Sequence, residues 1–358
     1  MISMRNCFGA LLFLLSAVAS FGQSQFGGAS LSGLITDPSG AGIANAKIVA
    51  TQTATNAVRE TQATDQGFYS LASLTPGVYD LSVEAAGFKT AKRTGITLNV
   101  GATASLDIAL QVGAPTETIT VTEDAPLVET ARSQTSTVIN ARSVSDLPIN
   151  GRNFLDFTAL TPGVVKDPTR GGDLTFGGQR GTMNSLTVDG TDSNNVFFGQ
   201  STGRAGSGRS PYSFSQDAVQ EFQVSTNTFA PEIGRAGGGV VNVITKSGTN
   251  AIHGTIFEFF RDRGLNANNF ANNRNGARKG NYHYNQFGGN IGGPIVKNKL
   301  FFFADYDGQR NSESITTVLA GGAAPADPAS QAALQILRGY VGQYPRQLNN
   351  NVFLLKGD

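Results

Sequence analysis

The stretch NQFGGNIGGPIV, residues 285–296, and the stretch KLFFFADY, residues 299–306, decide the fold class of this chain. Aromatic and β-branched residues, which favour strands, recur in both stretches, and the polar pair Lys297-Asn298 separates them. The two stretches therefore predict an antiparallel β-hairpin. Strands that cross a membrane need roughly 9–11 residues, with faces that alternate between lipid and lumen, and this pattern fits that requirement. An ordinary soluble sheet is the alternative interpretation.

The residues before this hairpin continue the strand pattern. In the segment His253–Arg261, Phe257 and Phe259 fall on one face and Glu258 on the other, because successive side chains of a strand point to opposite sides. An asparagine-rich polar loop follows at residues 266–279. These features predict another strand that is joined to the hairpin by a long loop.

Composition supports a β-rich protein and limits its function. The chain of 358 residues contains 44 glycines and 23 phenylalanines, only 15% of its residues are charged, and its formal net charge is +1. Such a composition is typical of turns and strands rather than helices. The near-zero charge gives no electrostatic reason to expect nucleic-acid binding.

The N-terminus has the pattern of a secretory signal peptide. Arg5 precedes an apolar run from Phe8 to Val18, and small residues follow, so that cleavage fits after Ala19 or after Gly22. The run is too short for a membrane-spanning helix, which needs about 20 apolar residues. We therefore assign residues 1–22 to a signal peptide. The sole cysteine lies within it, which leaves the mature chain without a disulfide or a thiolate metal site.

Residues 29–112 predict a small β-sandwich. Turn signals at Asp37-Pro38-Ser39-Gly40, Asp65-Gln66-Gly67 and Thr75-Pro76-Gly77 separate short runs of strand-forming residues. The last run, Leu106 to Val112, alternates most clearly and predicts one long final strand whose apolar residues are buried. This segment resembles the carboxypeptidase regulatory-like domain, which implies a seven-stranded prealbumin-like sandwich without peptidase activity.

Residues 127–250 combine glycine-rich turns with apolar strand segments. Gly151-Arg152-Asn153-Phe154 is followed by Thr187-Val188-Asp189-Gly190, and the segment closes on Gly234–Gly248. Glycines allow close backbone approach, and the run of valine and isoleucine within Gly234–Gly248 suits a buried strand. Short helices are predicted near Ser143–Leu147 and Phe154–Ala159.

Taken together, these motifs resemble a TonB-dependent outer-membrane receptor of the Oar-like branch. The resemblance implies a mainly β architecture with a prealbumin-like sandwich, an α+β plug domain at 127–250 and the first strands of a transmembrane β-barrel at 251–358. The family's plugs often carry Arg-Gly-Pro where this chain has Ser225-Thr226-Asn227, which puts a siderophore ligand in doubt. The residues that the resemblance marks as the plug core motif are Asp189, Gly190, Glu221, Arg235, Gly237, Gly238 and Asn242.

A short segment between the sandwich and the plug, residues 116–126, occupies the place of a TonB box in that family. Its threonine-rich sequence suits an extended strand that could add to a partner's sheet, although an eighth sandwich strand or a plain linker fits as well. The coupling residues implied are Glu117, Thr118, Ile119, Thr120, Val121 and Thr122. Arg204 and Arg209 lie in a glycine-rich loop and are candidates for ligand contacts on the plug.

The function implied is energised uptake or export of an unknown small-molecule, saccharide or peptide ligand through a plugged barrel. TonB and outer-membrane lipid would be the partners, the N-terminal domain would be periplasmic, and no cofactor or metal is expected. A surface carbohydrate-binding or adhesion protein that a barrel anchors is the alternative. An enzyme is not expected, because neither His253 nor His283 lies in a zinc-peptidase motif.

The remaining residues predict too few strands for a closed barrel. Residues 312–346 predict a long excursion with a helical patch at Ala329–Tyr340, and a further strand begins at Asn351. A barrel large enough to hold a plug has about 22 strands, whereas about four are in view here. Because strands in lipid must have both edges paired, we expect the chain to be an N-terminal fragment that is truncated at Asp358.

Overall fold

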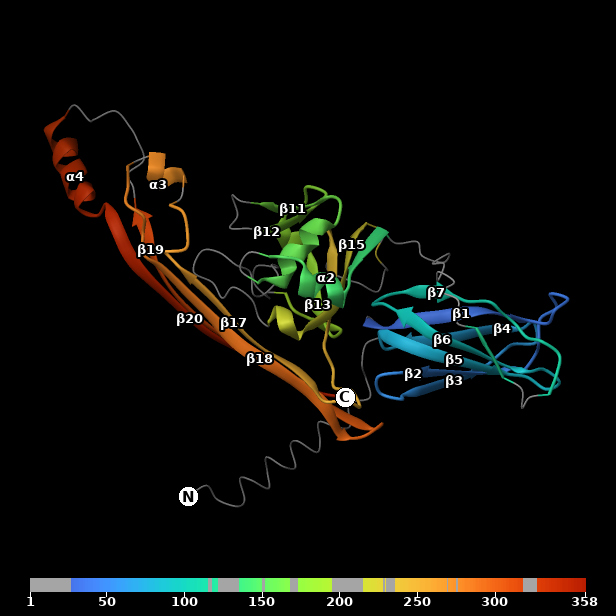
Figure 1. Ribbon diagram of the computed structural model, residues 1–358. Helices are drawn as coiled ribbons and strands as arrows, with labels where there is room; N and C mark the ends of the chain where they lie inside the picture. The colour runs from blue at the N-terminus through green and yellow to red at the C-terminus, as the bar shows by residue number, and fades with distance from the viewer. Residues whose placement is uncertain are drawn as a thin grey trace, which may run out of the picture. The chain divides into compact units, whose positions relative to one another are not determined.

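The computed structural model is mainly β, as the sequence predicts (Figure 1). It describes residues 27–114, 118–121, 135–149, 152–167, 173–194, 215–227, 229, 236–268, 270–274, 276–317 and 327–358. The proposed signal peptide lies outside the described residues. In the described part of the chain, no helix has both the length and the apolar character needed to cross a membrane.

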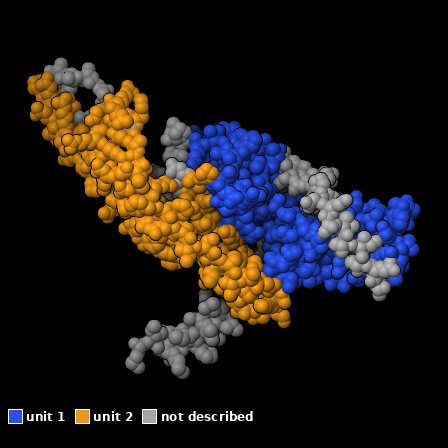
Figure 2. Space-filling view, in the orientation of Figure 1, with its two compact units in different colours: residues 1–147, 155–202, 219–245 blue, residues 148–154, 203–218, 246–358 orange. Residues whose placement is uncertain are grey.

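The chain divides into two compact units, which Figure 2 distinguishes by colour. The first comprises residues 1–147, 155–202 and 219–245, and the second comprises residues 148–154, 203–218 and 246–358. Two short segments from the region predicted as the plug are thus grouped with the C-terminal strands.

In the first unit, the N-terminal strands form the two sheets of a sandwich. One sheet has the order β4-β1-β7, with β8 also paired to β1, and the other has the order β3-β2-β5-β6-β9. The strands are β1 (Ala29–Thr36), β2 (Lys47–Gln52), β3 (Val58–Gln62), β4 (Phe68–Leu74), β5 (Gly77–Glu84), β6 (Thr90–Leu98), β7 (Thr103–Ser105), β8 (Ile108–Ala109) and β9 (Thr118–Val121). Alternate residues of β1 and β5, such as Leu31 and Leu81, are buried in a shared core, as the period of a strand requires.

The predicted final strand of the sandwich is wrong in detail. Instead of one continuous strand, β7 and β8 are two short strands that run parallel to β1. The carboxylate of Asp107 accepts a hydrogen bond from the backbone N–H of Leu34 at 2.8 Å, in place of a ladder bond between backbones. Ile108 and Leu110 are buried as predicted, but Val112 is 70% exposed.

A five-stranded sheet of order β10-β15-β16-β13-β14 forms the rest of the first unit's core. All six residues of β16 are buried, which confirms the prediction of a buried strand from its valine and isoleucine run. The elements of this region are β10 (Thr135–Ile139), α2 (Ala141–Asp146), η3 (Phe154–Leu160), β11 (Val164–Asp167), β12 (Asp173–Phe176), η5 (Gly181–Met183), β13 (Ser185–Val188), β14 (Thr191–Asp192), η6 (Gln216–Ala218), β15 (Val219–Asn227) and β16 (Val240–Thr245). The two short helices lie where they were predicted, the second as a 3₁₀ helix.

The second unit is built on a four-stranded antiparallel sheet, which we call the wall sheet, of order β17-β18-β19-β20. Figure 1 shows these strands as long, adjacent and curved. Their bounds are β17 (His253–Asp262), β18 (Tyr282–Val296), β19 (Leu300–Thr317) and β20 (Gly342–Gly357), with α3 (Phe270–Arg274) and α4 (Pro328–Gly339) between strands. The predicted hairpin is therefore confirmed as β18 and β19.

The strands of the wall sheet are longer than the sequence predicts. β19 has 18 residues and continues to Thr317, and β20 has 16 residues and begins at Gly342. The predicted excursion at residues 312–346 is therefore shorter, because β19 and β20 pair over its ends, from Ser312 with Gln347 to Thr317 with Gly342. The predicted helical patch is present as α4, whose N-cap Asp327 accepts a hydrogen bond from the N–H of Ser330.

The two faces of the wall sheet differ in polarity. On the face that we call the inner face, buried polar side chains alternate along the strands, namely Gln286, Asn290, Asp305, Asp307 and Gln309. On the outer face, Ile256 is 95% exposed, Phe353 73% and Leu355 82%. A polar buried face and an apolar exposed face reverse the pattern of a soluble sheet, and they match a strand that faces lipid on one side and a lumen on the other.

Removing a core side chain tests the sandwich assignment. Leu81 is 1% exposed, so Leu81→Ala should lower the free energy of unfolding of the N-terminal domain by roughly 2–5 kcal/mol. Val58 is 51% exposed, and Val58→Ala should change it by less than about 0.5 kcal/mol. Urea unfolding followed by circular dichroism measures both values, and equal effects of the two substitutions would refute the described core.

Candidate functional site

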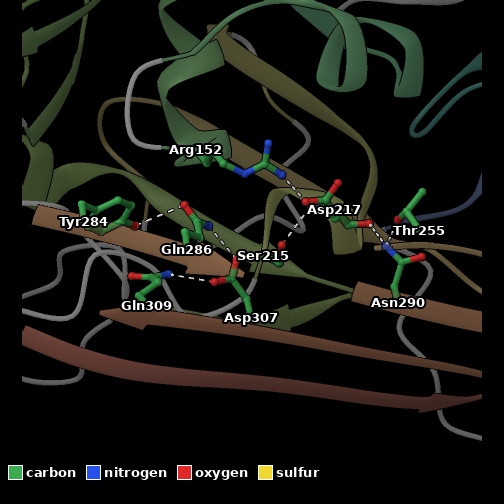
Figure 3. A network of polar contacts seen from close by, with 9 residues as sticks. All are labelled: Arg152, Ser215, Asp217, Thr255, Tyr284, Gln286, Asn290, Asp307 and Gln309. Atoms are coloured by element: carbon green, nitrogen blue, oxygen red, sulfur yellow. Dashed lines mark hydrogen bonds and ion pairs between the residues drawn. The ribbon is translucent and has the colours of Figure 1, made fainter. Parts of the chain in front are cut away.

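Polar contacts between the inner face of the wall sheet and two segments of the predicted plug form the candidate site (Figure 3). The first segment contributes Arg152, whose guanidinium forms an ion pair with the carboxylate of Asp217 in the second segment. The side chains are 12% and 24% exposed, respectively. Breaking a partly buried pair is costly, because the remaining charge is left without this partner.

Two aromatic side chains of β17 pack against the same guanidinium. Its central carbon lies 3.9 Å from the ring centroid of Phe259 and 5.0 Å from that of Phe257. The negative face of each ring attracts the cation, and the flat guanidinium can stack on a ring while its N–H groups bond a carboxylate. This explains why Phe257 and Phe259, predicted to share a face, stand on the inner side of the sheet.

Asn290 on β18 contacts the second segment from the wall. Its amide nitrogen donates to the hydroxyl of Thr255 at 2.7 Å and to the backbone carbonyl of Asp217 at 3.4 Å. Asp217 is therefore held by Arg152 through its side chain and by the wall sheet through its backbone. The hydroxyl of Ser215 also accepts a hydrogen bond from the backbone N–H of Asp217 at 3.1 Å.

Further along the inner face, three side chains form a short ladder. The amide of Gln286 donates to Asp307 at 2.7 Å, and the amide of Gln309 donates to the other oxygen of Asp307 at 3.4 Å. The hydroxyl of Tyr284 donates to Gln286 at 3.1 Å. These bonds satisfy polar groups that would otherwise be costly to bury.

Asp305 lies next to this ladder and is 4% exposed. Neither of its carboxylate oxygens has a hydrogen-bond partner among the described residues. Lys246 supplies a nearby positive charge; burial lowers the pKa of its ammonium, and the carboxylates of Asp217 and Asp305 oppose that shift. The site thus contains two cations and three carboxylates, namely Arg152, Lys246, Asp217, Asp305 and Asp307.

The plug core motif predicted from the sequence holds the five-stranded sheet together. Asp189, with a backbone φ of +47°, accepts a hydrogen bond from the N–H of Thr245 at 2.9 Å, and Gly190 follows with φ +79°. Asn242 accepts a hydrogen bond from the hydroxyl of Thr187 at 3.1 Å. These residues tie β13 to β16 and do not line the polar contact with the wall sheet.

Gly237 and Gly238 occupy a crowded turn before β16. The backbone N–H groups of both donate to the carbonyl oxygen of Met183, at 2.7 and 3.0 Å. A Cβ on Gly238 would lie 2.5 Å from the amide oxygen of Asn184. The side chain of Asn184 would have to shift to make room for it, so glycine at this position relieves crowding.

Glu221 on β15 is 5% exposed, and its carboxylate accepts a hydrogen bond from the N–H of Val100 at 2.6 Å. Burial raises the pKa of Glu221 to about 7, although the hydrogen bond from Val100 acts in the opposite direction. This carboxyl group therefore changes charge near neutral pH.

The predicted coupling segment is described only at residues 118–121, as strand β9. It pairs in parallel with β6, with Thr90 opposite Thr118 and Arg93 opposite Val121. β9 is the last strand in its sheet order. Four other predicted residues lie outside the described part of the chain, namely Glu117, Thr122, Arg204 and Arg209; Arg235 of the plug motif does as well.

The roles of four residues could not be predicted from the sequence, namely Arg152, Asp217, Asn290 and Asp305. Arg152 stands in the glycine-arginine-asparagine-phenylalanine motif, so its importance was signalled but its partner was not. Asp305 and Asp307 could have been placed on one face of β19, because they are two residues apart. None of these groups is arranged as a nucleophile with a base, and the contact joins parts of the protein instead.

The comparisons with known proteins agree with this architecture. Residues 244–337 match the outer membrane beta barrel domain, and residues 30–111 match the carboxypeptidase regulatory-like domain. The chain is 28% identical over 307 residues to the TonB-dependent transporter Oar of Myxococcus xanthus, a match that covers 82% of this chain and 27% of that protein. The chain thus spans about a quarter of the length of this relative.

Solved structures that resemble the chain include the outer membrane transporter YddB from Escherichia coli, at 16% identity and a TM-score of 0.43 over 62% of this chain and 30% of that one. The siderophore receptor PirA from Acinetobacter baumannii is 18% identical, with a TM-score of 0.37 over 64% of this chain and 38% of that one. From the sequence matches, the resemblance to TonB-dependent receptors of the Oar-like branch with a carboxypeptidase regulatory-like domain is confirmed.

The raised pKa of Glu221 predicts that stability falls with rising pH. The folded protein favours the protonated carboxyl of Glu221, which stabilises the fold. This contribution is fully present below pH 4.5, the pKa of the group in the unfolded chain, and is lost as the pH rises through about 7, its pKa in the folded protein. The loss should be on the order of 3 kcal/mol. Glu221→Gln keeps an oxygen acceptor for Val100 and should remove this pH dependence. Urea unfolding at a series of pH values measures it; an unchanged pH profile in the variant would contradict the assignment.

We predict that loss of the ion pair between Arg152 and Asp217 allows the segment around Asp217 to open locally. Arg152→Ala leaves the carboxylate of Asp217 buried without its partner, so amide hydrogen exchange in residues 215–218 should speed up at least about tenfold. Arg142 is the matched control, because its ion pair with Asp146 has side chains that are 90% and 61% exposed. Arg142→Ala should leave exchange in its own helix nearly unchanged. Similar exchange in both variants would mean that the Arg152 contact does not hold the segment.

Proposed function

We propose that the chain is the N-terminal part of an outer-membrane TonB-dependent receptor that transports a ligand and has no enzymatic activity. The observation that carries the proposal is the polarity of the wall sheet, whose inner face bears buried Asn290, Asp305 and Asp307 and whose outer face bears exposed Ile256 and Leu355. A sheet of this kind suits a wall between lipid and a polar lumen. The matched barrel domain and the Oar relative support the same function.

In this proposal, the plug segments close the lumen and must move for a ligand to pass. Arg152 and Asp217 bond to each other, while Phe259 and Asn290 of the wall sheet hold them in place. Breaking a few charged and hydrogen-bonded contacts would release the segments without unfolding the wall sheet. Ligand binding and a mechanical pull could both shift this equilibrium, since each favours one arrangement of the contacts.

The pull would reach the plug through the segment from Glu117 to Thr122. β9 is an extended strand whose backbone is paired on one side by β6 and is last in its sheet. Such an edge can accept a strand from a partner, with main-chain hydrogen bonds carrying the load. The partner we propose is TonB, with the N-terminal domain in the periplasm and residues 1–22 removed on export.

Proline substitution tests this coupling. Ile119→Pro and Val121→Pro each remove a backbone N–H and bend the strand, so energised uptake should be lost while the receptor still reaches the cell surface. Ile119→Ala is the control, because it keeps the backbone donor. Uptake in whole cells and surface labelling measure the two properties. Normal uptake by both proline variants would exclude strand addition at β9.

A further inference from the structure

A cavity of about 730 Å³ lies where the loop between β17 and β18 meets β19. Tyr282 and Glu313 line it and are partners across β18 and β19. They lie four residues beyond Gln286 and Gln309, which also pair with each other on the inner face. Because the period of a strand is two residues, Tyr282 and Glu313 share that face. The cavity therefore adjoins the polar side of the wall sheet, beyond the ladder at Asp307, and Ser314 of the opposite side lines it as well.

The walls of this cavity are fixed by bonds within the protein. Asn268 donates to Asn273 at 2.9 Å and to the carbonyl of Ala277 at 3.2 Å, and Asn272 donates to Asn268 at 3.1 Å. The N–H of Asn281 donates to Ser314 on β19 at 3.2 Å. Asparagine side chains thus build the loop, and a site shaped in advance loses little ordering entropy when a ligand binds.

The charges that line the cavity favour an anion. Among the described residues that line the cavity, Arg263 and Lys279 are the cations and Glu313 is the carboxylate. Glu313 is already ion-paired with Arg346 of β20, and the carboxylate of Asp262 lies near Arg263. Lys279 donates a hydrogen bond to the backbone carbonyl of Asn266. Arg263 has an exposed side chain, and a guanidinium can bind a carboxylate with two parallel hydrogen bonds.

The uncharged groups favour a hydroxyl-rich ligand. Asn266 and Asn281 line the cavity with amides that both donate and accept hydrogen bonds, as vicinal hydroxyls do. The ring of Phe270 is 79% exposed beside them. An exposed aromatic ring offers a flat apolar surface to the C–H face of a sugar.

From these groups we infer that the cavity binds an acidic oligosaccharide, with Arg263 on a carboxylate and Phe270 against a sugar ring. The inference rests on the proposed transport function and names the class of its ligand. A volume of about 730 Å³ falls within the usual range of ligand pockets. The site would present the ligand to the polar inner face of the wall sheet.

Binding to the full chain in detergent micelles tests this inference by titration calorimetry. The probes are trigalacturonate, the neutral trisaccharide maltotriose and the acidic peptide triglutamate. Trigalacturonate should bind at least about tenfold more tightly than either of the others. Arg263→Gln should weaken its binding about tenfold, roughly the contribution of one charge-assisted contact. Phe270→Ala should weaken it about as much, because it removes the apolar surface against the sugar ring. Arg338→Gln on α4, outside the cavity, is the control and should bind as the parent does.

The other outcomes each overturn the inference. Equal binding of maltotriose would remove the role of the carboxylate, tighter binding of triglutamate would identify a peptide site, and no binding of any probe would exclude a saccharide site. Circular dichroism of each variant shows whether it is folded, and Tyr282→Phe supplies a second, milder change in the cavity. Ligand binding in micelles does not depend on energy coupling. Loss of saccharide binding would therefore not change the result of the proline test, and loss of uptake in the proline variants would not change saccharide binding.

Discussion

The alternation of the wall strands is the constraint on which the rest of the structure depends. A strand places every second residue on the same side. If one side of β18 and β19 faces lipid, the opposite side must face the polar lumen. That side carries Gln286, Asp305 and Asp307, which are buried. Burial of such groups is costly unless they find partners. Gln286 and Asp307 form hydrogen bonds within the wall sheet, and Arg152 and Lys246 supply positive charge near Asp305.

In the proposed function, this arrangement would combine firm closure of the lumen with the ability to open. The contact at Arg152 combines an ion pair, two aromatic rings and the neighbouring bonds of Asn290, so it holds the segments in a defined place. The same contact is polar and local, while the wall strands are joined by continuous ladders of backbone bonds. A force on the plug would therefore act on a few side-chain contacts before it disturbed the sheet.

Much of the fold followed from local patterns, but the site did not. The hairpin of β18 and β19 and the buried strand β16 could be predicted because the residues that specify each of them lie close together in the sequence. The pairing of Arg152 with Asp217 spans 65 positions, and nothing local to either residue specifies the other. The break between β7 and β8 was missed for a related reason, since Asp107 bonds to Leu34, which lies 73 positions away. The two-residue period of β19 places Asp305 and Asp307 on the same face, but it does not identify the residues of other segments that lie near them.

The most direct test is to cross-link the plug segment to the wall sheet. Asp217→Cys is paired either with Asn290→Cys on the inner face or with Ile291→Cys on the outer face, where Ile291 is 49% exposed. A short bis-maleimide applied to the receptor in outer-membrane vesicles, followed by mass spectrometry, measures the yield of each link. We predict that the inner pair links efficiently and the outer pair does not. Equal yields, or a link only from Ile291→Cys, would contradict the account.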